Sequence, residues 1–264
     1  MPSPELAARA EAARRAVLGQ VPLLLREFAR VESRWKRDGT RVTATDLAIS
    51  ERLCAEIAAQ FPDDQRFTEE SGHVGSEPVL SRFCWVLDPI DGTNNFALGI
   101  PQCAISLGLM ERGQPVFGCV YDLGRRLLLQ GGPEFGLLDG ERRARALAGP
   151  TTKESLVGFH NPLDEALVPG AARVLSRYKI RALGSATLHL AYVAAGLLDG
   201  AIDYNVKIWD LAAALALCRG GGADVRFLNG EQLPMTRFDV DMGRIVYVAG
   251  APALCEALAG LTLG

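Results

Sequence analysis

Apolar residues recur every three or four positions over residues 6–31, and this spacing predicts a long helix with one apolar face. A second helix is expected to follow, capped by Thr45 or Asp46 and ending near residue 60, where a Phe-Pro pair stops it. The chain is therefore predicted to open with two helices.

A continuous apolar run at residues 83–87 breaks with the helical spacing and predicts a strand buried on both faces. Shorter apolar runs follow, separated by brief turns, which is typical of a meander of hairpins. These further strands are expected at residues 103–110, 115–121, 126–130 and 135–138. The first half is thus predicted to be α+β, with two helices against an antiparallel sheet.

From about residue 155 the strand and helix patterns alternate, which predicts an α/β half with helices on the faces of a sheet. The expected strands cover residues 155–159, 179–183, 201–204, 224–228 and 244–249. The expected helices cover residues 163–177, 186–197, 211–219 and 252–261. The segment between the halves is the expected boundary, which divides the chain into residues 1–146 and residues 147–264.

The composition narrows the class of protein. Of 264 residues, 48% are hydrophobic and 22% are charged, which excludes a disordered or collagen-like chain. The net charge of −3 gives no reason to expect a nucleic acid partner. We find no signal peptide, no run of membrane-spanning length, no C-x-x-C pair and no zinc-like histidine spacing. These observations predict a cytoplasmic protein with buried free thiols and no membrane contact.

The most informative segment is the turn that follows the apolar run, where two carboxylates lie three residues apart. It reads Asp88-Pro89-Ile90-Asp91-Gly92-Thr93. Carboxylates this close repel each other unless a cation lies between them, and hard oxygen ligands suit magnesium. Backbone amides after the glycine would offer a place for a phosphate. An ordinary turn has the same composition and is the alternative interpretation.

Acidic residues in three other segments also have simple structural explanations. The pair Glu69 and Glu70 fits a solvated loop, and Asp46 and Asp210 each fit the first residues of a helix. Their joint occurrence with the turn at residues 88–93 is what indicates a site.

Together these segments resemble the inositol monophosphatase superfamily, which also contains fructose bisphosphatases, bisphosphate nucleotidases and a class of histidinol phosphatases. The family signature D-P-I/L-D-G-T-x-N-F is matched by residues 88–96, and W-D-x-A-A is matched by residues 209–213. The elements V-T-x-x-D and G-E-E-S-G are matched by residues 42–46 and 68–72, with Thr68 in place of the first glycine. The resemblance implies a layered αβαβα sandwich of the inositol monophosphatase and fructose bisphosphatase type.

The resemblance also implies a set of metal ligands between the two halves. Glu69, Asp88 and the carbonyl oxygen of Ile90 would bind a first Mg²⁺, and Asp88, Asp91 and Asp210 would bind a second. A third, weaker Mg²⁺ site near Glu69 is a feature of relatives, so two or three ions are expected.

The catalytic residues implied by the resemblance are Asp46, Thr93 and Glu69. Asp46 would accept the Thr93 hydroxyl hydrogen, so that Thr93 can orient the attacking water. The bound metal would lower the pKa of this water and neutralise the phosphoryl oxygens. The residues expected to bind the substrate are Gly92, Thr93, Gly184, Ser185, Ala186, Asp203 and Lys36.

Asp203 and a further residue, Arg219, each allow two interpretations. Asp203 lies where inositol phosphatases carry a glutamate that binds ring hydroxyls, but it also fits a polar residue alternating out of a strand. Arg219 replaces a family alanine, and either a surface charge or a substrate contact explains it.

The expected function is the Mg²⁺-dependent hydrolysis of a small phosphorylated substrate, namely inositol monophosphate or a similar polyol or sugar phosphate. The first alternative is the same chemistry on histidinol phosphate, fructose bisphosphate or a 3′-phosphoadenosine nucleotide. The second is a non-catalytic regulator that binds phosphate or metal. The resemblance further implies a homodimer that is inhibited by lithium.

Overall fold

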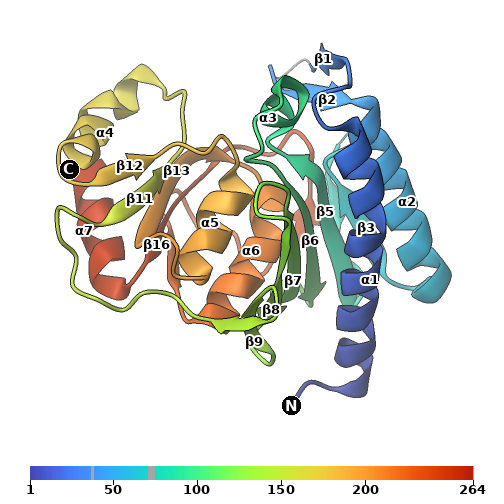
Figure 1. Cartoon of the computed structure of the whole chain (residues 1–264). Helices are drawn as coiled ribbons and strands as arrows, with labels where there is room; N and C mark the ends of the chain where they lie inside the picture. The colour runs from blue at the N-terminus through green and yellow to red at the C-terminus, as the bar shows by residue number, and fades with distance from the viewer. Residues whose placement is uncertain (37–38, 71–74, 264) are drawn as a thin grey trace.

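The computed structural model describes residues 1–36, 39–70 and 75–263, which fold into five layers (Figure 1). One pair of helices covers a seven-stranded sheet, a second pair lies between this sheet and a five-stranded sheet, and a third pair covers the far side. The pairs are, in this order, α1 (Pro4–Glu27) with α2 (Ala44–Gln60), α5 (Ala186–Ala194) with α6 (Ile208–Gly221), and α4 (Val168–Leu175) with α7 (Pro252–Leu263). These layers confirm the predicted αβαβα sandwich.

The second helix begins earlier than predicted. Its first residue is Ala44 and its N-cap is Thr43, not Thr45 or Asp46. The Thr43 hydroxyl accepts the Asp46 N–H at 3.4 Å, and the Asp46 carboxylate accepts the Thr43 N–H at 2.8 Å. This reciprocal capping satisfies two backbone donors that a helix start would otherwise leave without partners. Asp46 therefore lies in the first turn of α2, with its Oδ2 atom committed to the cap.

The first sheet contains the predicted meander and two short strands that the sequence pattern did not reveal. Its order is β10-β9-β8-β7-β6-β5-β3, and β3 pairs parallel with β5 whereas the other pairs are antiparallel. The strands are β3 (Gln65–Thr68), β5 (Phe83–Asp91), β6 (Ala104–Glu111), β7 (Gln114–Asp122), β8 (Leu127–Gly132), β9 (Gly136–Asp139) and β10 (Arg142–Ala144). The sheet is mixed, so the prediction of a purely antiparallel sheet was wrong. Helices contact both faces of β5, and all of its residues are buried.

Helix α6 approaches the first sheet closely at two glycines on neighbouring strands. A Cβ added to Gly108 in β6 would lie 2.8 Å from the backbone of Ala212, and one added to Gly118 in β7 would lie 2.2 Å from the carbonyl oxygen of Ala213. Both distances are shorter than a normal carbon contact, so only glycine fits. This close packing places α6 directly against β5, β6 and β7.

The second sheet has the order β12-β11-β13-β16-β14, with β11 parallel to β12 and β13, and with β16 antiparallel to β13 and β14. The strands are β11 (Leu156–Phe159), β12 (Lys179–Arg181), β13 (Gly200–Val206), β14 (Asp224–Phe227) and β16 (Ile245–Gly250). The helix predicted at residues 163–177 is divided into a 3₁₀ turn, η1 (Glu165–Leu167), and α4. Pro169 lies in the first turn of α4, where its fixed φ angle suits a helix start.

A small sheet and an aromatic group join the two halves of the chain. Strand β4 (Glu77–Pro78) pairs antiparallel with β15 (Arg237–Phe238). The ring of Phe238 stacks on Phe67, with centroids 4.9 Å apart, and lies 5.7 Å from the ring of Trp209. Phe67 and Trp209 come just before two candidate ligands, Glu69 and Asp210. This aromatic contact therefore holds the end of β3 next to the start of α6.

The two large sheets lie on either side of the predicted boundary. Strand β10 ends at Ala144, and β11 begins at Leu156. Helices α5 and α6 of the second half pack against strands of the first sheet. The division into units of residues 1–146 and 147–264 stays a prediction.

Two expectations about the whole chain can be compared with the structure. The six cysteines, all within the described parts, are free thiols, and five of them are buried, as predicted. Among the residues that the structure describes, no helix combines the length and the apolar character needed to cross a bilayer.

Candidate active site

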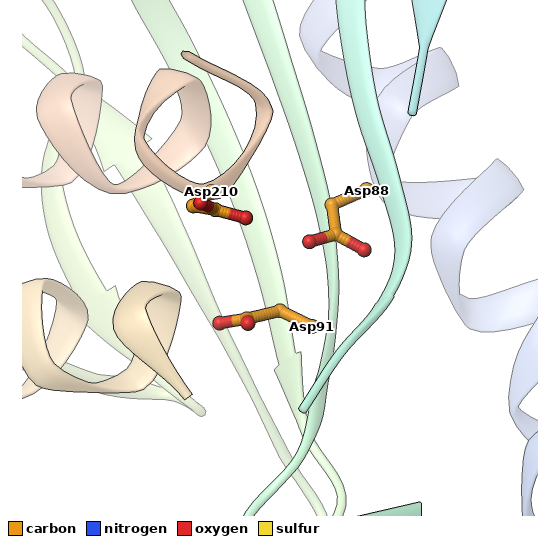
Figure 2. A group of neighbouring side chains, drawn as sticks. All are labelled: Asp88, Asp91 and Asp210. Atoms are coloured by element: carbon orange, nitrogen blue, oxygen red, sulfur yellow. The ribbon is translucent and has the colours of Figure 1, made fainter. Parts of the chain in front are cut away.

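Three aspartates meet where β5 ends and α6 begins (Figure 2). Asp88 and Asp91 come from the end of β5, and Asp210 comes from the first turn of α6. One carboxylate oxygen from each of them lies within 4.8 Å of the others. We call Asp88, Asp91 and Asp210 the carboxylate cluster.

The backbone after β5 turns sharply to place these side chains. Asp88 accepts the N–H of Ile90 on its Oδ1 atom at 3.0 Å, which stabilises the turn. Gly92 then adopts a left-handed conformation with φ +83°, and the short helix α3 (Thr93–Leu98) begins. A Cβ at Gly92 would lie 2.9 Å from the carbonyl oxygen of Gln102, so both the backbone angle and the space require glycine. Gly92 is the N-cap of α3.

The other two carboxylates are held from the second half of the chain. Asp91 accepts hydrogen bonds on Oδ2 from the hydroxyl of Ser185 and the N–H of Thr187, both at 2.6 Å. Asp210 accepts the N–H of Lys207 on Oδ2 at 2.7 Å, and the Thr187 hydroxyl donates to the Asp210 carbonyl at 2.7 Å. The start of α5 therefore fixes Asp91 and Asp210 relative to each other.

The cluster concentrates negative charge in a buried place. Burial is the main cause that raises the pKa of Asp88 and of Asp210 well above the usual value, and neighbouring carboxylates raise both further. Burial also raises the pKa of Asp91, although the hydrogen bonds from Ser185 and Thr187 oppose this. A divalent cation would relieve the repulsion. Because every donor is a carboxylate oxygen, the site fits a hard cation such as Mg²⁺.

Glu69 lies beside the cluster, and a lysine holds its carboxylate. Lys36 directly follows β1 (Ser33–Trp35), which forms a hairpin with β2 (Arg41–Thr43). The Lys36 Nζ atom lies 2.7 Å from Glu69 Oε1 and 2.5 Å from Glu70 Oε1. Burial by itself would lower the pKa of Lys36, but these two carboxylates raise it above its usual value. Lys36 is therefore a charged neighbour of the site.

The oxygens of Glu69 are not part of the carboxylate cluster, but the charge of Glu69 affects the pKa of two of its members. Burial raises the pKa of Glu69 to about 7. Its charge in turn raises the pKa of Asp88 and Asp210. The Glu69 N–H donates to the Leu87 carbonyl at 3.2 Å, which places Glu69 beside Asp88, and Lys36 is its ion-pair partner. Ser71 and Gly72, the last residues of the matched element, lie outside the described residues.

Asp46 and Thr93 lie next to each other, as the resemblance implies. The Thr93 Oγ1 atom is 3.0 Å from Asp46 Oδ1 and 2.9 Å from the carbonyl oxygen of Ile90. A hydroxyl has one hydrogen to donate, so only one of these acceptors receives it at a time. Asp46 is fully buried, and burial raises its pKa to about 6.

The segment at residues 184–186 begins α5 and is mostly buried. Ser185 is the N-cap of α5, and its hydroxyl donates to Asp91. Ala186 is buried beside it. Gly184 has φ +72°, and a Cβ there would lie 2.8 Å from Asn95 Nδ2. The Ser185 side chain therefore positions a carboxylate, and the expected contact of residues 184–186 with a substrate stays a prediction.

The structure corrects the interpretations of Asp203 and Arg219. Asp203 is 0% exposed, so it is neither a polar residue that alternates out of its strand nor open to a substrate hydroxyl. Arg219 lies at the C-terminal end of α6, whereas Asp210 is at the start of this helix. Its guanidinium donates to the Pro115 carbonyl at 3.1 Å and to the Gln114 side chain at 2.7 Å, so it binds the start of β7.

Sequence reasoning missed several residues that hold the site together. Thr43 precedes Asp46 by three positions, which matches the spacing of a capping box, and this signal was available. Lys207 and Thr187 donate backbone N–H groups, and any residue type except proline provides such a donor. No side-chain pattern could have indicated these last two.

Without metal, the folded protein is expected to lose stability as the pH rises from about 4 to about 7. In the folded state Asp46 has a pKa of about 6 and Glu69 a pKa of about 7. Unfolded carboxyls release their protons near pH 4, so the folded state binds more protons over this range and is disfavoured as the pH rises. Urea unfolding in EDTA at several pH values measures this slope.

Addition of Mg²⁺ near pH 7.5 is expected to raise the Tm by about 5–10 °C at about a hundred times its dissociation constant. Potassium chloride of equal ionic strength is the control, since it screens charge without occupying a site. A metal-free stability that rises between pH 4 and 7, or an equal shift with potassium, would contradict this view of the candidate site.

Comparison with known proteins agrees over nearly the whole chain. A model of the inositol monophosphatase family matches residues 5–262. The inositol-1-monophosphatase ImpA of Mycolicibacterium smegmatis is 36% identical over 248 residues, which cover 87% of this chain and 83% of that protein. The Nus factor SuhB of Pasteurella multocida is 33% identical over 207 residues and covers 74% of each chain.

A solved structure shows the same architecture. The crystal structure of the extragenic suppressor protein SuhB from Bartonella henselae has a TM-score of 0.84 to this fold at 25% identity. The match covers 97% of this chain and 98% of that one. The five layers are thus those of a known fold.

Proposed function

The chain belongs to the inositol monophosphatase family and is thus a phosphoric monoester hydrolase, and from this premise we propose that it hydrolyses inositol monophosphate or a similar polyol or sugar phosphate. The observation that carries the proposal is the carboxylate cluster, in which three buried or half-buried aspartates approach within 4.8 Å. A cluster of like charges destabilises the fold unless a cation is bound, so its presence favours metal-dependent chemistry.

We propose Mg²⁺ as the cation. Asp88, Asp91 and Asp210 would hold it, and Glu69 and the carbonyl oxygen of Ile90 are the further ligands that the resemblance implies. When bound, Mg²⁺ would lower the pKa of a water and neutralise the phosphoryl oxygens. Two or three ions, lithium inhibition and a homodimer are further proposals that rest on the resemblance.

Thr93 and Asp46 are proposed to orient the attacking water. When Asp46 is ionised, its Oδ1 atom accepts the Thr93 hydroxyl hydrogen across 3.0 Å. The Thr93 hydroxyl then has no hydrogen left to donate, so its oxygen can accept a hydrogen bond from the attacking water. Asp46 cannot turn away, because the Thr43 N–H and hydroxyl hold its other oxygen.

The backbone around α3 is proposed to hold the phosphate. The amides of Gly92 and Thr93 begin this helix directly after the cluster, and amides at such a turn suit an anion. Lys36, whose side chain is 20% exposed, adds a positive charge at the edge of the site. Gly184 leaves no room for a side chain next to α3, since a Cβ there would lie 2.8 Å from Asn95 Nδ2.

The test is a phosphate-release assay with and without Mg²⁺ on four substrates: inositol 1-phosphate, fructose 1,6-bisphosphate, histidinol phosphate and adenosine 3′,5′-bisphosphate. We expect release only with Mg²⁺ and the highest kcat/KM on inositol 1-phosphate. An Asp210→Asn sample from the same purification excludes a contaminating phosphatase. No release from any substrate would overturn the proposal.

A relative named Nus factor SuhB favours one alternative, a regulator that binds phosphate or metal without catalysis. Asp46, Thr93 and Glu69, the residues assigned to catalysis, are all present in this chain. A regulator would show the Mg²⁺-dependent rise in Tm without any release of phosphate. The two assays together therefore separate the functions.

A further inference from the structure

A second polar group lies in the core behind the candidate site. Asp203 of β13, His189 of α5 and Tyr247 of β16 are each 0% exposed. The Tyr247 hydroxyl donates to Asp203 Oδ2 at 2.5 Å, and His189 Nδ1 lies 3.2 Å and 3.3 Å from the two Asp203 oxygens. Buried polar side chains are costly unless they are paired, and these three pair with one another.

The hydrogen bonds assign the tautomer of His189. Its Nε2 atom accepts the N–H of Leu183 at 3.0 Å, so this nitrogen carries no hydrogen. Nδ1 must then carry the proton and donate it to Asp203. Burial by itself would raise the pKa of Asp203, but His189 and Tyr247 lower it below its usual value. Asp203 therefore accepts a hydrogen bond from each of the other two members of the group.

Leu183 connects this group to the site. Its N–H is held by His189, and its carbonyl oxygen accepts Asn95 Nδ2 at 2.8 Å. Asn95 belongs to α3, which follows the turn at Gly92. The next residues of the same segment include Ser185, which donates to Asp91. Residues 183–187 are thus bound to the buried group on one side and to the site on the other.

We propose that Asp203, His189 and Tyr247 are positioning residues that hold residues 183–187 against Asp91, and that Asp203 acts through this segment without contacting substrate. The inference deepens the proposed function and rests on it for its kinetic part. Its structural part, the tautomer of His189, can be measured whether or not the protein is a phosphatase.

The tautomer is measured by long-range proton–nitrogen NMR of the imidazole rings in the full chain, which has three histidines. We expect His189 to carry its proton on Nδ1. Asp203→Asn leaves one acceptor oxygen in place of two, so the hydrogen bonds to His189 and Tyr247 are expected to weaken and the His189 ring signals to shift, while Nδ1 keeps its proton because the Leu183 N–H still faces Nε2. A wild-type ring protonated on Nε2 would overturn the proposal even if the protein hydrolyses phosphate.

The kinetic test compares a substrate with ring hydroxyls, inositol 1-phosphate, with one that lacks them, p-nitrophenyl phosphate. Asp203→Asn is expected to lower kcat about tenfold on both substrates and to raise the Mg²⁺ concentration needed for half of the Tm shift. A loss confined to inositol 1-phosphate would show that Asp203 contacts substrate. An unchanged Mg²⁺ requirement with a lower Tm would show a structural role alone. Either result would overturn the proposal.

A milder pair of variants tests the proposal even if Asp203→Asn does not fold. Tyr247→Phe removes one hydroxyl from the group and is expected to lower kcat about two- to fivefold on both substrates. Tyr204→Phe is the matched control, because its hydroxyl belongs to the same sheet but lies near Thr262, at 3.4 Å. Equal kinetics for the two variants would also contradict the proposal.

Discussion

Asp91→Asn is expected to lower kcat about a thousandfold, because a ligand worth several kcal/mol of transition-state stabilisation is lost. The fold should persist. The asparagine carbonyl oxygen can still accept the hydrogens of Ser185 and Thr187, which Asp91 Oδ2 accepts at 2.6 Å. The asparagine NH₂ group would then face the cluster and repel a cation there.

The same variant is expected to be more stable than the wild type when metal is absent. It removes one charge from a group in which burial and repulsion raise the pKa of Asp88 and Asp210. Mg²⁺ should therefore shift its Tm less. Thermal unfolding in EDTA and in Mg²⁺, together with phosphate release, measures both effects.

Asp122→Asn is the control for this stability gain. Asp122 is a buried carboxylate at the end of β7, but it accepts hydrogen bonds from the Tyr192 hydroxyl at 2.5 Å and the Arg125 N–H at 3.0 Å. Its loss should destabilise the protein, since its donors would lose a charged acceptor. Full activity of Asp91→Asn, or a fall in its metal-free stability to match Asp122→Asn, would refute our view of the cluster.

Thr93→Ala is expected to lower kcat about a hundredfold with little change in KM, which is the usual scale for losing a group that orients a proton transfer. Thr93→Ser keeps the hydroxyl and should retain most of the activity. The alanine variant should fold, because the Thr93 hydroxyl is not needed to cap α2, where Thr43 and Asp46 satisfy each other.

Coupling between Thr93 and Asp46 tests the assigned pair. Asp46→Asn should slow the reaction by a similar factor, and the double variant should be little slower than either single one, since the two residues act as a unit. Initial rates of phosphate release under saturating substrate give all three values. Losses that multiply in the double variant would show that the residues act independently.

The long elements of the fold could be predicted because their own sequences carry strong periodicity. The apolar run at the start of β5 predicted a strand buried on both faces, and every residue of β5 is buried. Strands β3 and β10 were missed because each is short and contains only one apolar residue, Phe67 and Ala144, so neither shows an apolar run. Helix starts were displaced because an aspartate suits both the cap and the first turn.

The candidate site could be predicted where a motif kept its residues close in sequence, as with Asp88 and Asp91. Contacts between distant segments were predicted only where the family resemblance supplied them, as with Asp46 and Thr93. Asp203 pairs with His189, 14 residues away, and with Tyr247, 44 residues away, and no local pattern indicates either pairing. An acidic residue at this position was therefore assigned to substrate, although its partners are within the core.

The capping hydrogen bonds of α2 and α6 have a practical consequence. The N–H groups of Thr43 and Lys207 each donate to an aspartate of the site, Asp46 and Asp210. The chemical shift of a backbone amide proton responds to the charge on the oxygen it faces. These two resonances would therefore act as built-in probes, one in each half of the chain, that report protonation or cation uptake without any label in the pocket.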